Sequence, residues 1–215
     1  MIRFKDRADA GRKLVSKLLQ YKNKPSAVVI GLPRGGVVTA FEVAKELNLP
    51  LDIIVSRKIA SPAQPELALG ALSQEGFTFF DEKIMRMMAV TKEELAPIVH
   101  AEKQEAKRRL KLYRGDLPPL DLENKVAILV DDGIATGATM MATILSARNL
   151  KAQKIIIAVP VSPPETLQKI KKEVDEVICL GTPSVFRGVG AFYDSFAQTD
   201  DNEVISLMKR SKRLQ

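Results

Sequence analysis

The chain has 215 residues, of which 46% are hydrophobic, enough for one well-packed core, so we expect a single domain over residues 1–215. No apolar run approaches the roughly 20 residues that span a bilayer, and the opening MIRFKDR lacks the apolar core of a secretion signal. We therefore expect a cytoplasmic protein without a membrane partner. The formal charge of +7 owes much to basic clusters in residues 103–114 and 209–213. Because neither cluster interleaves aromatic residues that could stack on bases, each is interpreted as a solvated helix face, and nucleic acid is not expected as a partner.

The first part of the chain predicts a β-α-β unit. Residues 9–21 place leucines and a valine on one helical stripe, which predicts an amphipathic helix. Residues 26–31 form a short apolar run that ends in a Gly/Pro turn, residues 37–47 have apolar positions at helical spacing, and residues 51–55 form a second apolar run. Continuous apolar runs of this length are typical of strands buried on both faces of a parallel sheet.

A less regular stretch follows. Residues 56–66 contain two prolines and little periodicity, which predicts an extended or mobile loop, and residues 67–72 and 76–80 predict short strands. Residues 91–114 predict a helix that opens on the capping box TKEE and ends before a pair of prolines. We interpret residues 81–120 as a helical insertion.

Three further apolar runs, at residues 125–130, 154–160 and 176–180, alternate with helical patterns at residues 139–150 and 164–172. Buried strands that alternate with helices predict the fold class. We expect an α/β fold with a doubly wound, mainly parallel five-stranded sheet. Ligands of such sheets gather at the carboxyl ends of the strands.

The most informative stretch is VAILVDDGIATGATM, residues 126–140, in which a buried strand delivers Asp131 and Asp132 at its carboxyl end. Adjacent buried acids are costly unless they have polar or cationic partners, and sugar hydroxyls or a hydrated Mg²⁺ would supply them. The loop that follows can turn backbone N–H groups, with the hydroxyls of Thr136 and Thr139, toward one anion at a helix N-terminus. These features describe a site for ribose 5-phosphate.

The same stretch resembles the signature of the type I phosphoribosyltransferases, which bind phosphoribosyl pyrophosphate (PRPP). The resemblance implies their fold, and it implies that Asp131 and Asp132 bind the ribose 2- and 3-hydroxyls, directly or through Mg²⁺, the expected cofactor. The residues that it assigns to the 5-phosphate are Gly133, Ala135, Thr136, Gly137, Ala138 and Thr139. Ala135 stands where family members for hypoxanthine and guanine carry an Asp, which disfavours a 6-oxopurine acceptor without establishing adenine.

A second loop, GLPRGGV at residues 31–37, follows the first predicted strand and opens a helix. A second anion could be held there by N–H groups and by an arginine. It resembles the pyrophosphate loop of the family. The residues assigned to pyrophosphate are Pro33, Arg34, Gly35 and Gly36.

After the second predicted strand come Arg57 and Lys58, where the family has a basic pair followed by a mobile loop that closes over pyrophosphate. Glu66 in this loop could orient the nucleophile or act as a base. With the two aspartates, these residues form the predicted catalytic set. An ordinary surface loop with solvated charges is the alternative.

Residues 181–215 are interpreted as a terminal segment that, with the N-terminus, forms a small hood. Its loop concentrates aromatic residues, and Phe186 and Tyr193 are the predicted rings for stacking on an acceptor base. Packing of the last strand against the terminal helix explains these rings equally well.

The resemblance implies transfer of ribose 5-phosphate from PRPP to a nitrogenous acceptor, such as a nucleobase, with release of pyrophosphate. A homodimer is the family's expected assembly. The alternative is a sensor of PRPP or a nucleotide on the same fold, which would have less need of Arg57 and Lys58.

Overall fold

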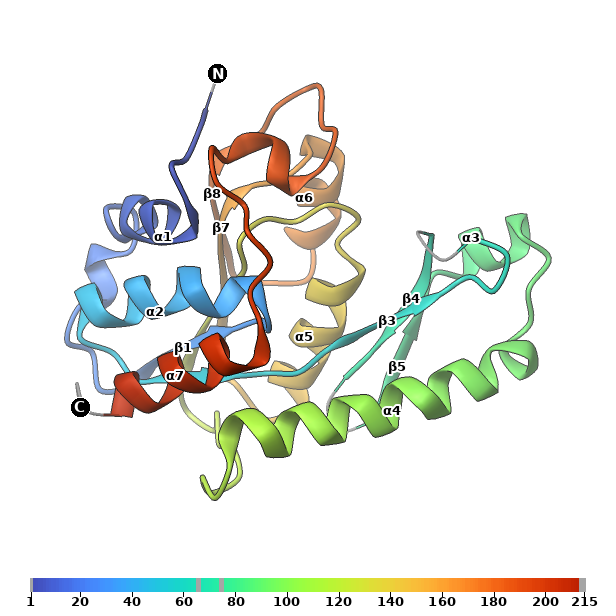
Figure 1. Ribbon diagram of the computed structural model, residues 1–215, viewed down its shortest axis with the longest axis horizontal. Coiled ribbons are helices and arrows are strands. Elements are labelled where there is room, and N and C mark those ends of the chain that lie inside the picture. Colours follow the sequence, from blue (N-terminus) through green and yellow to red (C-terminus); the bar gives the residue numbers. More distant parts are fainter. Residues whose placement is uncertain (1, 65–66, 74–75, 213–215) are drawn as a thin grey trace.

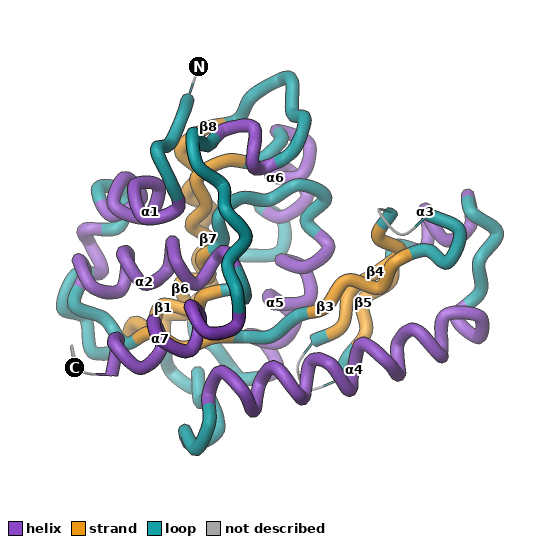
Figure 2. The backbone as a smooth tube through the Cα atoms, in the orientation of Figure 1, coloured by secondary structure: helices purple, strands orange, loops and turns teal. Residues whose placement is uncertain are grey.

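A computed structural model of the protein describes residues 2–64, 67–73 and 76–212. Its main feature is a five-stranded sheet in the order β2-β1-β6-β7-β8, with every neighbouring pair parallel (Figures 1 and 2). The strands are β1 (Ala27–Gly31), β2 (Leu51–Ile53), β6 (Val126–Val130), β7 (Lys154–Val161) and β8 (Glu176–Gly181). The predicted five-stranded parallel sheet is therefore confirmed.

Helices cover both faces of this sheet, as Figure 1 shows. One face carries α1 (Arg7–Val15), α2 (Gly35–Leu47) and α7 (Asp201–Lys212), and the other carries α5 (Ala138–Asn149) and α6 (Pro164–Ile170). The strand side chains alternate accordingly: Val29 joins the first core, whereas Val28 and Ile30 join the second. Each fully buried Val or Ile contributes about 1.5–3 kcal/mol to stability relative to an exposed side chain.

The helix expected over residues 9–21 is shorter in the structure. Asp6 caps α1 by accepting a hydrogen bond from the Asp9 backbone N–H, and α1 ends at Val15. A tighter 3-10 turn, η1 (Leu19–Tyr21), follows. The backbone N–H of Leu18 bonds to Val15 O at 2.9 Å, three residues back, and this tightening keeps the Leu18 side chain fully buried.

A second sheet projects from the main one (Figure 2). It is antiparallel and contains β3 (Arg57–Ala60), β4 (Ala68–Leu72) and β5 (Thr78–Phe80). The two short strands predicted after residue 66 are confirmed, but the loop predicted from residue 56 is wrong for residues 57–60. The prolines that suggested a loop follow β3 in the sequence. Ile59 is the one buried residue of the four in β3, so this strand lacks the continuous apolar run that marks the strands of the main sheet.

The residues interpreted as an insertion contain α3 (Glu82–Met87) and α4 (Lys92–Arg114). The predicted long helix is confirmed, together with the capping box between Thr91 and Glu94. The short α3 was not predicted. In Figure 1, α4 runs along the second sheet and returns to the core, where it contacts α7.

The sheet order fixes where a ligand would bind. β1 and β6 are neighbours, yet β1 leads into α2 on one face and β6 leads into α5 on the other. The two connections diverge and leave a crevice at the carboxyl ends of β1 and β6, the usual ligand position in doubly wound sheets.

Candidate functional site

The two predicted anion loops begin side by side at this crevice. Gly31 and Val130, the last residues of β1 and β6, are register partners, and the backbone N–H of Leu32 donates to Val130 O at 3.1 Å. The structure therefore brings together the loop at residues 32–36 and the loop at residues 131–137.

The acid pair lies where β6 ends. Both Asp131 and Asp132 are partly buried, and Asp131 Oδ1 accepts the backbone N–H of Asp132 at 2.8 Å. Burial raises the pKa of Asp131 well above its usual range, and the neighbouring charge of Asp132 raises it further. Burial also raises the pKa of Asp132, although the guanidinium of Arg7 opposes this. Such a pair is prepared to accept hydrogen bonds from hydroxyls or to meet a cation.

The loop after the acid pair turns back to form the start of α5. Gly137 precedes α5 with φ of 83°, a left-handed conformation that favours glycine. Thr166 of α6 fixes the loop by donating to Ala135 O at 2.8 Å. A pocket of about 200 Å³ is lined by Asp131, Gly133–Met140 and Val189. A helix N-terminus facing such a pocket favours an anion.

The loop from β1 packs directly on the acid pair. A Cβ atom at Gly35 would lie 2.1 Å from Asp132 Oδ2, and one at Gly36 would lie 2.6 Å from Asp131 Oδ1. Only glycines allow this approach. The peptide bond between Pro33 and Arg34 is cis, and Arg34 is the N-cap residue of α2.

The predicted pyrophosphate-binding cations have acidic partners here. Arg34 Nη1 lies 3.7 Å from Asp201 Oδ1, and Arg57 Nε lies 2.5 Å from Glu102 Oε2 of α4. Lys58 follows Arg57 in β3. Glu66 lies outside the described residues.

The aromatic segment lies beside the acid pair. Tyr193 is buried and its hydroxyl donates to Asp132 O at 2.6 Å, while burial raises its pKa. Phe186 is partly exposed and stacks on Phe192 of η2 (Val189–Phe192). Stacking of either ring on an acceptor stays a prediction.

Sequence reasoning missed Arg7 and Asp201. Arg7 Nε donates to Asp132 Oδ2 at 2.6 Å, and Asp201 accepts the Tyr113 hydroxyl at 2.6 Å beside Arg34. Each arises from a fold contact between segments far apart in sequence, and no local pattern marks either residue.

Mg²⁺ remains compatible with this arrangement. Among residues 2–64, 67–73 and 76–212, no group of three or more His, Cys, Asp or Glu side chains could hold a metal ion. Mg²⁺ often uses only one or two carboxylates together with substrate phosphates and water, and Asp131 and Asp132 match that limited donor set. Within the same described ranges, no helix is long and apolar enough to cross a membrane.

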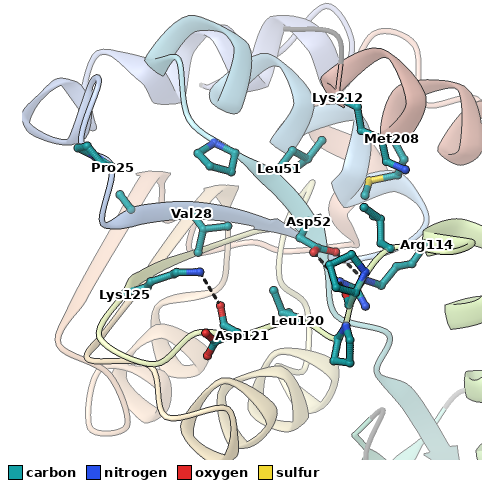
Figure 3. Close-up of a pocket in the computed structure, with 15 residues that line it drawn as sticks. Pro25, Val28, Leu51, Asp52, Arg114, Leu120, Asp121, Lys125, Met208 and Lys212 are labelled. Carbon is teal, nitrogen blue, oxygen red and sulfur yellow. Dashed lines mark hydrogen bonds and ion pairs between the residues drawn. The ribbon is translucent and has the colours of Figure 1, made fainter. Parts of the chain in front are cut away.

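Two larger pockets lie outside the small loop pocket. One of about 590 Å³ lies between α6 and β4–β5 and shares Ala135, Thr136 and Ala138 with the small loop pocket. The other, of about 440 Å³, lies at the opposite, amino ends of β1 and β2 (Figure 3). The bidentate pair of Asp52 and Arg114, at 2.8 and 2.9 Å, forms part of its wall.

Comparisons with known proteins agree with the architecture of the main sheet. A model of the family described as "Phosphoribosyl transferase domain" matches residues 3–195. A Mycobacterium tuberculosis protein named "Putative phosphoribosyl transferase" is 41% identical over 210 residues, which are 98% of this chain and 47% of that protein. The chain therefore spans about half the length of the curated relatives it matches.

Among solved structures, the crystal structure of TT1426 from Thermus thermophilus matches with a TM-score of 0.81 and 34% identity, covering 97% of this chain and 99% of that one. The structure of the AQ2163 protein from Aquifex aeolicus matches with a TM-score of 0.50 and 14% identity over 81% of this chain and 73% of that one. The second likeness concerns the fold alone.

Proposed function

The chain belongs to the phosphoribosyl transferase domain family, and we propose that it transfers ribose 5-phosphate from PRPP to a nitrogenous acceptor and releases pyrophosphate. One observation carries the proposal: two loops suited to anions converge on a partly buried acid pair at adjacent strand ends. A donor with phosphates at both ends of a ribose requires this combination.

PRPP would lie across the crevice between β1 and β6. The 5-phosphate would bind at the start of α5, in the pocket formed by Gly133–Met140. Asp131 and Asp132 would accept the ribose hydroxyls. The pyrophosphate would then reach the loop at residues 33–36, which packs on the same two carboxylates.

The proposed reaction is a substitution at C1. The acceptor nitrogen forms the new bond to C1, the C1–O bond to pyrophosphate breaks, and its electron pair leaves with pyrophosphate, while the acceptor nitrogen loses its proton to a base or to solvent. Mg²⁺, when held by Asp131 and Asp132 with the substrate, supplies charge stabilisation to the oxygens of the leaving group. Arg34 and Arg57 would exchange Asp201 and Glu102 for the pyrophosphate, so their positive charges would face the oxygens on which negative charge develops.

We propose a nucleobase-like acceptor, placed near Ala135 and under the aromatic segment. Ala135 offers no carboxylate for the N7 proton of a 6-oxopurine. Of the two proposed stacking rings, Phe186 is the more exposed, whereas the bond from the Tyr193 hydroxyl to Asp132 O favours support of the motif backbone. We further propose that the protein is a homodimer, which light scattering of the purified protein would test, and that it lies in the cytoplasm, which cell fractionation would test.

The first experiment is calorimetric titration of Mg²⁺ and PRPP into wild type and into the Asp131→Asn/Asp132→Asn double variant. We expect binding in wild type and its loss in the double variant. Asp116→Asn removes an exposed carboxylate outside the crevice and serves as the charge control. No binding to wild type, or equal binding to the double variant, contradicts the proposed donor.

A pyrophosphate-release screen across purine and pyrimidine bases then tests catalysis. Release with one base identifies the acceptor. PRPP binding without release for every base would instead support the sensor function.

A further inference from the structure

Arg7 reaches the proposed ribose site from the first turn of α1. Its Nε atom donates to Asp132 Oδ2 at 2.6 Å, although the two residues lie 125 positions apart. The side chains are only 11% and 14% exposed, respectively. Removing one partner of an ion pair so far from solvent is costly, because the other charge is left buried without a counter-charge.

The guanidinium of Arg7 is held from three directions. In addition to Asp132, its Nη1 atom donates to Ala197 O at 2.6 Å. Its carbon Cζ lies 3.7 Å from the centroid of the Phe196 ring, close enough for a stacked cation–π contact. Both partners belong to the segment that joins η2 to α7. Arg7 therefore ties the C-terminal segment to the acid pair.

The same pair also touches the proposed pyrophosphate loop. A Cβ atom at Gly35 would lie 2.6 Å from Arg7 Nε and 2.1 Å from Asp132 Oδ2. Arg7 is thus placed where the ribose acids and the pyrophosphate loop meet, and its Nε atom is a hydrogen-bond donor to one of the two aspartates.

On the basis of the proposed function, we infer that Arg7 is a positioning residue of the donor site. It fixes Asp132 through Oδ2, so that Oδ1 can accept a ribose hydroxyl or face Mg²⁺. Its charge also offsets one of the two adjacent carboxylates, which lowers their mutual repulsion before the donor binds. The N-terminal helix and the C-terminal segment would therefore contribute to donor affinity without contacting PRPP.

The test is the affinity for Mg²⁺ and PRPP, measured by calorimetry, in Arg7→Gln, Arg7→Lys and Arg3→Gln. Arg3 offers a matched control, since it is an arginine of the same segment paired with Asp194 on the exposed surface. Loss of a charge-assisted bond predicts affinity about 10- to 100-fold weaker in Arg7→Gln. Arg7→Lys keeps the charge and should recover part of this loss, and Arg3→Gln should bind within about twofold of wild type.

Addition of ethylguanidinium to Arg7→Gly gives a second readout that a purely structural role would not produce. The small cation should restore PRPP affinity in Arg7→Gly and should leave Arg3→Gln unchanged. If Arg7→Gln cannot fold, the role of Arg7 is tested with Arg7→Lys and Phe196→Leu instead. Both variants are expected to keep the fold and to weaken PRPP binding severalfold.

The outcomes separate the two proposals. No PRPP binding to wild type contradicts the proposed function itself. Binding to wild type with Arg7→Gln unaffected, or with Arg3→Gln equally weakened, contradicts the role of Arg7 alone.

Discussion

Replacement of Gly36 by alanine tests the contact between the two loops. The added methyl would lie 2.6 Å from Asp131 Oδ1, 2.9 Å from Asp131 Cα and 3.1 Å from Val130 O. Two of these atoms belong to the backbone of β6 and its end, so a change of side-chain rotamer cannot remove the clash. The loop at residues 32–36 must therefore move away from the acid pair.

Two effects of opposite sign determine the stability of Gly36→Ala. Overpacking against a fixed neighbour costs about 1–3 kcal/mol. Gly36 is the second residue of α2, so alanine recovers at most about 1 kcal/mol through helix propensity. The clash outweighs the gain, and we expect a net loss of about 1–2 kcal/mol, which lowers the Tm by about 2–8 °C for a chain of this size. PRPP affinity should fall at least about tenfold, since misplacement of a binding group by a fraction of an ångström weakens its contacts.

Thermal melts followed by circular dichroism and calorimetric titration of PRPP would measure both effects. Gly115→Ala is the control: a Cβ there meets no atom within 4 Å, but φ is +56°. It should lose about 1 kcal/mol of stability from backbone strain and keep its PRPP affinity. A Gly36→Ala protein as stable as wild type, with unchanged PRPP affinity, would refute the close packing of the loops.

Three other substitutions have defined expectations. The Asp131 carboxyl has a raised pKa in the folded protein, so the folded protein binds more protons than the unfolded chain as pH rises above 3.8. Wild type therefore loses stability through this pH window, whereas Asp131→Asn does not. The stability of Asp131→Asn relative to wild type should accordingly increase with pH. Melts from pH 3 to 8 would check this, and a pH-independent difference would contradict it. Tyr113→Phe removes the 2.6 Å bond to Asp201 and should lower the Tm by about 2–4 °C, corresponding to about 1 kcal/mol; an unchanged Tm would show that the bond contributes nothing. Thr91→Ala removes the capping box and should weaken the start of α4 by about 1 kcal/mol, seen as faster hydrogen exchange at residues 92–95, whereas unchanged exchange would argue against the cap.

The main sheet could be predicted closely because its central strands are buried on both faces. Residues 126–130 and 154–160 are continuous apolar runs for that reason, and the structure places β6 and β7 there. Residues 57–60 could not be recognised in this way. This strand is covered mainly on one side and carries Arg57 and Lys58, so its sequence resembles that of a loop.

The site residues that could be predicted from the sequence are those that lie next to one another in the chain. Asp131, Asp132 and the loop after them are contiguous, so one local pattern contained the strand, the acids and the helix start together. Arg7 reaches Asp132 only after the chain has folded. Periodicity placed Arg7 before a helix and carried no information on which strand end that helix would meet.

Two arginines of the basic cluster at residues 103–114 form partly buried ion pairs in the folded protein. As a solvated helix face, it would be fully exposed, but the Arg109 and Arg114 side chains are 17% and 10% exposed and pair with Glu105 and Asp52. Arg114 links the end of α4 to β2 through its bond to Asp52, and Tyr113 links it to α7 through its bond to Asp201.

The Arg57–Glu102 pair joins β3 of the second sheet to the middle of α4, whereas the Arg114 and Tyr113 contacts hold its end. If pyrophosphate takes Arg57 from Glu102, the attachment of α4 to the core stays intact. We therefore expect donor binding to increase hydrogen exchange around Glu102 and to leave the end of α4 near Arg114 protected. Equal changes around Glu102 and around Arg114 would show that α4 moves as a whole.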